Sequence, residues 1–250
     1  MTTKTILTLG LFVCATATQL LAHSVWIEPG EDKQPVIRFA EPSGNLERSP
    51  GHLDSLTVPM AFQTATASTN PPALLNVSKQ KDHYAIAGVS GTNIIGVETS
   101  FTVRAGRKPS FYARWQPADA GEGKLLLTLD LVPTGKPGEA RLYLRGQPRG
   151  GVKAMLMTPN GDEKEFTADA EGYIRVPATE PGLYLLTVAH QREPIAGVHL
   201  GVAYKETSHN CSLAWEQPVV VVCRRPVQST DNLSQTTGSG KSGRRLESPP

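Results

Sequence analysis

Short apolar stretches that alternate with polar residues recur through most of the chain, and no long helical pattern interrupts them. Alternation with a period of two is typical of half-buried β-strands. The strongest turn signal between two such stretches is Asn160-Gly161, which favours a tight hairpin. The pattern predicts an all-β protein with strands at 36–39, 74–77, 83–87, 94–103, 111–115, 125–132, 140–145, 152–157, 165–167, 173–176 and 183–190.

A change of composition divides these strands into two groups. Residues 116–123 read Gln-Pro-Ala-Asp-Ala-Gly-Glu-Gly, which is typical of a linker. A chain of 250 residues is long enough for two domains of moderate size. Short strands at this spacing are typical of β-sandwiches. We therefore expect one β-sandwich domain at 23–115 and a second at 124–225.

The first 22 residues have the features of a secretory signal peptide. Lys4 supplies the positive charge, and the apolar run that follows is too short to span a bilayer. Cleavage after Ala17 or after Ala22 fits the local pattern equally well. Only the second site would leave His23 as the first residue, with a free α-amine beside its imidazole. That pair of groups could chelate a metal ion.

The rest of the composition favours an exported protein, periplasmic or secreted. No other apolar run reaches about 18 residues, so we expect no membrane span in the mature chain. Lysine and arginine together number 25 against 23 aspartates and glutamates, which argues against nucleic acid as a partner. Residues 226–250 are rich in Ser, Thr, Gly and Gln, and we expect them to form a disordered tail.

Removal of the signal peptide would leave two cysteines, Cys211 and Cys223. If residues 216–218 form a three-residue turn, these cysteines face each other across an antiparallel pair of strands, within disulfide distance. An even number of cysteines in an exported protein fits this interpretation. The sequence therefore predicts a cross-strand disulfide in a C-terminal hairpin, and the alternative is a pair of buried thiols.

The sequence offers little support for an enzyme. It contains no G-x-S-x-G motif, no glycine-rich phosphate loop and no H-E-x-x-H motif. Histidines are the remaining candidates, since imidazole is a common ligand of copper, zinc and nickel. No pair is spaced as a local metal-binding motif, so folding would have to assemble any site. Ordinary surface or core roles are conceivable for His52, His83, His190, His199 and His209.

Several segments taken together resemble one family. They include Ala22-His23-Ser24-Val25-Trp26-Ile27-Glu28-Pro29 after the signal peptide and Pro181-Gly182-Leu183-Tyr184-Leu185-Leu186 in the second half. In order between these two come the segments 36–42, 129–133, 144–152 and 169–173. Over roughly residues 22–216 the chain resembles the exported bacterial DUF4198 family, whose members are often labelled nickel-uptake substrate-specific proteins.

This resemblance implies Ig-like β-sandwich domains in the periplasm and a histidine directly after the signal peptide. Carried over by position, it implies that His23, His190 and His209 hold a metal ion. The expected function is therefore the binding of nickel, cobalt or copper, or its delivery to a membrane transporter component, without enzymatic activity. Two alternatives stay open: a copper oxidoreductase with a histidine brace, resembling lytic polysaccharide monooxygenases, and an Ig-like structural or carrier domain without metal.

Overall fold

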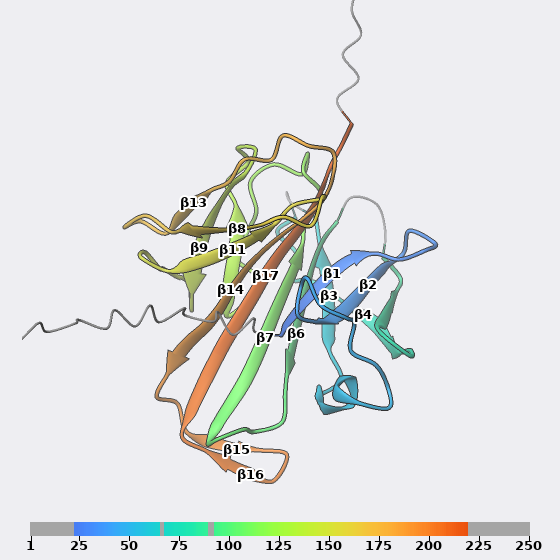
Figure 1. Ribbon diagram of the computed structural model, residues 1–250, viewed down its shortest axis with the longest axis vertical. Coiled ribbons are helices and arrows are strands. Elements are labelled where there is room, and N and C mark those ends of the chain that lie inside the picture. The colour runs from blue at the N-terminus through green and yellow to red at the C-terminus, as the bar shows by residue number, and fades with distance from the viewer. Residues whose placement is uncertain (1–22, 66–67, 90–92, 220–250) are drawn as a thin grey trace, which may run out of the picture. The chain divides into compact units, whose positions relative to one another are not determined.

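The computed structural model describes residues 23–65, 68–89 and 93–219, and the regular structure of these residues is β-strand apart from one short 3-10 helix (Figure 1). The all-β prediction is confirmed. The predicted signal peptide, at 1–22, and the predicted tail, at 226–250, lie outside the described residues. In the described part of the chain no helix is long and apolar enough to cross a membrane.

The strands of the N-terminal half are β1 (Ser24–Pro29), β2 (Pro35–Ala40), β3 (Met60–Thr64), β4 (Ala73–Lys79), β5 (Tyr84–Ala87), β6 (Ile94–Ser100) and β7 (Arg107–Trp115), with the 3-10 helix η1 (His52–Ser55) before β3. The C-terminal half contains β8 (Leu129–Pro133), β9 (Glu139–Leu144), β10 (Gln147–Pro148), β11 (Lys153–Met157), β12 (Glu163–Thr167), β13 (Tyr173–Arg175), β14 (Gly182–Glu193), β15 (Gly197–His199), β16 (Val202–Tyr204) and β17 (Glu206–Gln217).

One large sheet joins the two halves of the chain. Its eleven strands follow the order β1-β2-β5-β4-β3-β6-β7-β17-β14-β11-β12. The junction is a parallel pairing of β7 with β17, in register from Arg107 and Glu206 to Trp115 and Ala214. A smaller sheet contains β8, β9, β10 and β13, and β15 pairs with β16 at the end of the long strands (Figure 1).

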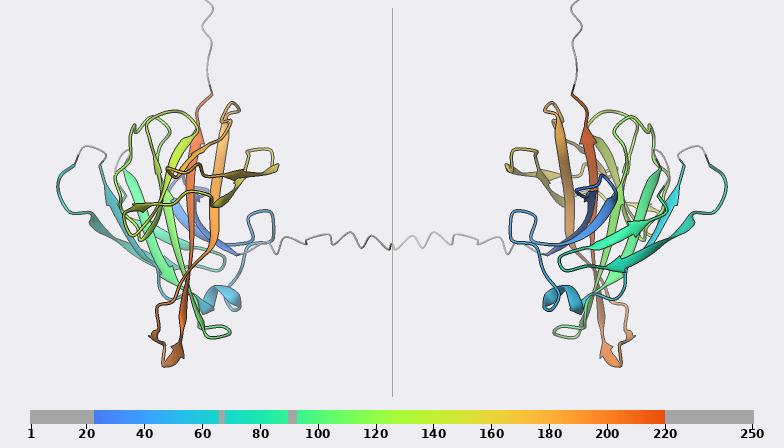
Figure 2. Two further views of the ribbon diagram at one scale, coloured as in Figure 1. Left: turned by 90° about the vertical axis from the view of Figure 1, so that its left-hand side faces the viewer. Right: turned by 90° about the vertical axis from the view of Figure 1, so that its right-hand side faces the viewer.

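The long central strands are buried because both of their faces are covered. On one face of β17, Cys211, Leu213 and Trp215 pack with residues of β8, β9 and β13 in one hydrophobic cluster. On the other face the sheet curls, so that β1 packs against β7 and β17. Ser212 Oγ donates a hydrogen bond of 2.7 Å to the Val25 carbonyl oxygen at this crossing. The side views show the N-terminal strands turned against the central ones (Figure 2).

This curl encloses a second hydrophobic cluster. It contains Ile27, Ile37, Leu53 and Val97, with a group of aromatic rings at one end. Trp26 points to the opposite side of β1 from Ile27, where it packs with Leu185 and Ala214 of the long strands. Side chains on both faces of β1 therefore pack in a hydrophobic cluster, which explains why the first four residues of the strand are all buried.

The predicted C-terminal hairpin is wrong. Its first strand would be the end of β17, but β17 already has a neighbour on each side. Cys211 pairs with Val188 of β14 and with Tyr112 of β7, so no position beside it is free for a returning strand. In the structure Cys211 is a free, buried thiol, and burial raises its pKa well above the ordinary value. Cys223 lies outside the described residues.

The segment predicted as a linker is anchored to the protein by a buried polar network. Arg114 and Asp130 are both fully buried, and the guanidinium group donates two hydrogen bonds, of 2.9 and 2.7 Å, to the carboxylate. Arg114 also donates to Gln116 Oε1, and Gln116 Nε2 donates to the Gly121 carbonyl oxygen. The loop residues 116–123 are therefore held in place from inside the protein.

We expect Asp130→Asn to lower the free energy of unfolding by about 3–5 kcal/mol, because the Arg114 guanidinium would stay buried without its counter-charge. Urea denaturation at neutral pH measures this change. The control is Lys153→Met, which breaks an exposed pair with Glu165 and should cost less than about 1 kcal/mol. Equal losses in the two variants would contradict a special role for the buried pair.

Candidate metal centre and its cavity

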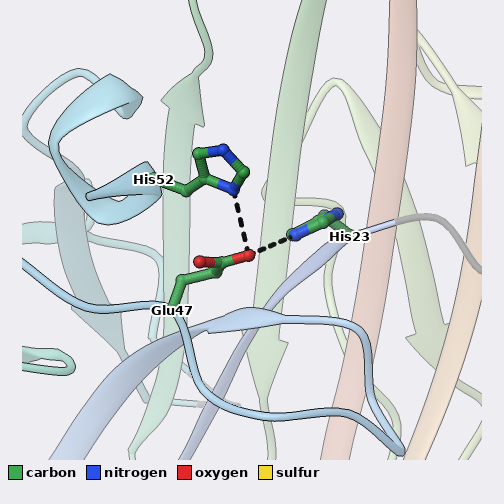
Figure 3. A group of neighbouring side chains, drawn as sticks. All are labelled: His23, Glu47 and His52. Atoms are coloured by element: carbon green, nitrogen blue, oxygen red, sulfur yellow. Dashed lines mark hydrogen bonds and ion pairs between the residues drawn. The ribbon is translucent and has the colours of Figure 1, made fainter.

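Two histidines and a glutamate from separate segments meet at one point. His23 Nε2 lies 2.6 Å from Glu47 Oε1, and His52 Nδ1 lies 3.2 Å from the same oxygen (Figure 3). One potential metal-binding atom from each of the three side chains lies within 4.8 Å of the other two. The side chains of His23, Glu47 and His52 are 34, 23 and 56% exposed, so the cluster can be reached from solvent. We call these three residues the His-Glu cluster.

Local structure fixes each member of the cluster. His23 directly precedes β1, and its ring packs on Phe39 of β2 with 5.1 Å between the ring centroids. Glu47 lies in the loop after β2, where its backbone N–H donates to the Phe39 carbonyl oxygen. His52 begins η1, and the fully buried Leu53 next to it anchors that turn in the core.

The η1 turn is also held by a carboxylate. Asp54 accepts hydrogen bonds from Ser49 Oγ, from the Gly51 backbone and from Lys79 of β4. The hydrogen bond from Lys79, followed by those from Ser49 and Gly51, lowers the pKa of Asp54 to about 2. This carboxylate is therefore charged at any physiological pH, and it positions the turn that presents His52.

The surroundings of Glu47 favour the ionised form of its carboxyl group. Desolvation acts to raise its pKa, but the hydrogen bonds from His23 and His52 outweigh this effect, and the pKa lies below the ordinary value. A carboxylate that is ionised and shared by two imidazoles is a suitable ligand for a divalent cation. The same arrangement also permits a proton to sit between the groups when no metal is bound.

The cluster lies beside a cavity of about 670 Å³. Phe39, Phe101 and Phe111 form its apolar surface, and the Phe39 ring contacts the other two at 5.6 and 5.7 Å between centroids. The remaining lining residues are mainly basic or polar: His23, His52, Arg104, Arg107, Pro109, His190, Arg192, Ser208 and Asn210. This volume is in the range of small-molecule sites and much larger than a bare metal ion needs.

His190 lines the same cavity as His23. It lies at an irregularity in the pairing of β14 with β17, between Val188 and Gln191, and its backbone is left-handed with a φ of 59°. Asn210 holds this conformation, since its Oδ1 accepts a 3.0 Å hydrogen bond from the His190 backbone. Desolvation, together with Arg192 and Arg107, lowers the pKa of His190. This histidine is therefore neutral at pH 7.

The structure does not bring His209 to this cavity. Side chains alternate along β17, and Ser208 and Asn210 line the cavity, so His209 points to the opposite face of the sheet. There it is buried, with Nδ1 3.0 Å from the Tyr112 hydroxyl and Nε2 2.9 Å from Glu193 Oε2. Both ring nitrogens thus face groups of the protein interior. Of the three histidines implied by the resemblance, only His23 and His190 share a cavity.

Sequence reasoning missed Glu47 and His52. His52 lies in a loop rich in Pro and Gly, which suggested a solvated side chain, and Glu47 has no neighbouring motif. The spacing of five residues between them was the only local signal, and it is common in loops. His83 pairs with Asp82, which is the ordinary surface role that the sequence suggested. The expectation that His199 points outward from its strand is wrong, since Val198 and Leu200 are the exposed residues and His199 Nε2 is buried.

Comparison of the chain with protein-family models and with curated proteins finds no match.

The buried His209 makes stability depend on pH. Desolvation lowers its pKa despite the neighbouring Glu193, so the unfolded chain binds a proton here at a higher pH than the folded protein. The free energy of unfolding should therefore be unaffected by this group above the ordinary histidine pKa of about 6.5, and it should fall as the pH drops below that value. We expect His209→Gln to reduce the difference in free energy of unfolding between pH 7.5 and pH 5.5, by urea denaturation at about those two values.

His83→Gln is the control for this experiment, because His83 is a partly exposed histidine outside the cavity. An unchanged pH dependence in His209→Gln would contradict the assignment of His209 as a buried neutral group.

Proposed function

We propose that this protein binds a divalent transition metal at the His-Glu cluster and serves to carry or deliver it. The observation that carries the proposal is the meeting of two imidazoles and one ionised carboxylate within 4.8 Å, beside an open cavity. Nitrogen ligands bind such metals at about 2.0–2.1 Å. Two ligands of one ion are then about 3 Å apart, close to the 2.6 and 3.2 Å separations found here.

The donor set supports nickel, cobalt or copper without selecting one of them. Imidazole suits all three, and a carboxylate is compatible with each. The order of affinities for divalent metals places copper above nickel and cobalt in most sites of this type. Affinity measured with pure protein will follow this order, so the metal carried in the cell depends on which metal is supplied.

The orientation of the His23 ring indicates whether its α-amine, which cleavage after Ala22 would set free, is needed as a metal ligand. An α-amine and an imidazole of one residue form a small chelate ring through Nδ1, which is the arrangement of a histidine brace. The nitrogen of His23 that faces Glu47 is Nε2. Metal binding at the His-Glu cluster therefore does not need the α-amine. This geometry favours a carrier site over the alternative of a brace-type copper oxidoreductase.

The resemblance to the DUF4198 family agrees with this proposal, as do the expected export signal and a periplasmic or secreted location. We extend the expected Ig-like architecture only to residues 124–217. Support for it comes from the packing of β8, β9 and β13 against β11, β14 and β17 around one hydrophobic cluster. A membrane transporter component would be the receiver of the metal, and an Ig-like domain that binds no metal is the alternative.

Removing one ligand should weaken metal binding. We expect Glu47→Gln and His52→Ala each to raise the Kd for Ni(II) and Cu(II) at least about tenfold, because the site would keep only two protein ligands. Isothermal titration calorimetry at pH 7.5 measures this effect. His83→Ala is the matched control, since it removes a histidine outside the cluster. Wild-type protein without binding tighter than about 10 μM, or equal losses in the control, would overturn the proposal.

Adding one alanine before His23 separates the two modes of metal binding. If the metal is held through Nε2, the extended protein should bind Cu(II) within about threefold of protein that begins at His23, because no ligand is lost. A loss greater than about tenfold would instead show that the α-amine is a ligand. That result would favour the histidine brace over the His-Glu cluster.

A further inference from the structure

The cavity beside the His-Glu cluster has a wall with excess positive charge. Arg104, Arg107 and Arg192 all line it. One carboxylate lies near them: Glu206 Oε1 is 3.4 Å from Arg107 Nε and 3.7 Å from Arg192 Nε. In the described part of the chain, Arg104 has no carboxylate partner, and its guanidinium lies over the Phe101 ring at 4.7 Å. Two of the three guanidinium groups thus share one carboxylate, and the third has none. We call them the arginine wall.

The backbone brings two of these arginines close together. Arg104 and Arg107 exchange two backbone hydrogen bonds of 2.9 Å across the turn that leads into β7. The two residues between them, Ala105 and Gly106, both have positive φ, as in a tight type I′ hairpin. Directly opposed residues project from the same face of the hairpin, and like charges in that position destabilise it. A bound anion would remove this repulsion.

The third arginine approaches from the neighbouring strands. Arg192 of β14 is opposite Ser208 of β17, and Ser208 is opposite Pro109 of β7, so all three side chains share the face that lines the cavity. The same charge acts on His190 in the cavity: desolvation, followed by Arg192 and Arg107, lowers the pKa of this histidine. Two unconnected segments therefore direct guanidinium groups at one space.

The size and surface of this space define the kind of anion. Guanidinium groups bind carboxylates with paired, directional hydrogen bonds. About 670 Å³ accommodates a small organic molecule, and the three phenylalanines offer it an apolar contact. The His-Glu cluster at the same cavity supplies three metal ligands and leaves other coordination positions open. A small organic carboxylate that chelates metals could bind to the arginine wall and, through its metal ion, to the His-Glu cluster at the same time.

We propose that the arginine wall binds the carboxylates of a small organic chelator, so that the protein takes up its metal as a chelate rather than as a bare ion. The metal half of this statement rests on the function proposed above. The His-Glu cluster would bind the cation, the arginine wall would bind the negative charge of the chelator, and the phenylalanine rings would contact its carbon skeleton.

Equilibrium dialysis with isotope-labelled citrate tests this inference, with and without one equivalent of Ni(II) and with nickel measured in the same samples. We expect citrate to be retained in about equal amount to nickel, and only when nickel is present. Arg104→Gln combined with Arg192→Gln should lower citrate retention at least about tenfold while leaving binding of Ni(II) alone unchanged. Arg149→Gln is the control, because this arginine is exposed and outside the cavity.

The other outcomes separate the two proposals. If nickel is retained from the mixture with citrate but citrate is not retained with it, the chelate is overturned and the metal site stands. Failure to bind nickel in any form would overturn the metal site. Citrate retained equally without nickel would support the arginine wall but overturn its link to the metal. Displacement of citrate by an equal concentration of inorganic phosphate would show a general anion site and overturn the assignment to organic carboxylates.

Discussion

The parallel pairing of β7 with β17 is the constraint on which the rest of the structure depends. Parallel neighbours need a long crossover connection, and here the whole C-terminal half of the chain lies between the two strands. In the order of strands across the sheet, all other N-terminal strands lie beyond β7 and the C-terminal strands β14, β11 and β12 lie beyond β17. It also gives β17 two neighbours, which is why this strand is buried along most of its length.

The buried pair of Arg114 and Asp130 supports this arrangement at the point where the chain leaves β7. Arg114 is on β7 and Asp130 is on β8, so their hydrogen bonds join the large sheet to the smaller one. Two charges in a fully buried position are tolerated because the carboxylate also accepts backbone hydrogen bonds from Leu126 and Leu127. Residues 116–123, predicted as a linker between two domains, form the connection between β7 and β8, and hydrogen bonds through Gln116 attach it to Arg114.

The cavity owes its character to three parts of the fold that meet at one end of the long strands. His23 before β1, Glu47 in the loop after β2 and His52 of η1 form the His-Glu cluster. The hairpin before β7 supplies two arginines, and the bulge of β14 supplies His190 and Arg192. The ligands proposed for a cation and the guanidinium groups proposed to bind an anion therefore lie at the same cavity. That combination is the physical basis for regarding the cavity as a site for a neutral or weakly charged pair of metal and chelator.

The sequence by itself determined many of the strands and several turns. Alternation of apolar and polar residues is a local property, and it located β9, β11 and β14 as well as the hairpin at Asn160-Gly161. Only the tertiary structure decided which strands are neighbours, since the pairing of β7 with β17 depends on packing between distant segments. That pairing ruled out the hairpin at Cys211. The strand alternation set His209 on the far face, and loop conformations brought His52 and Glu47 to His23.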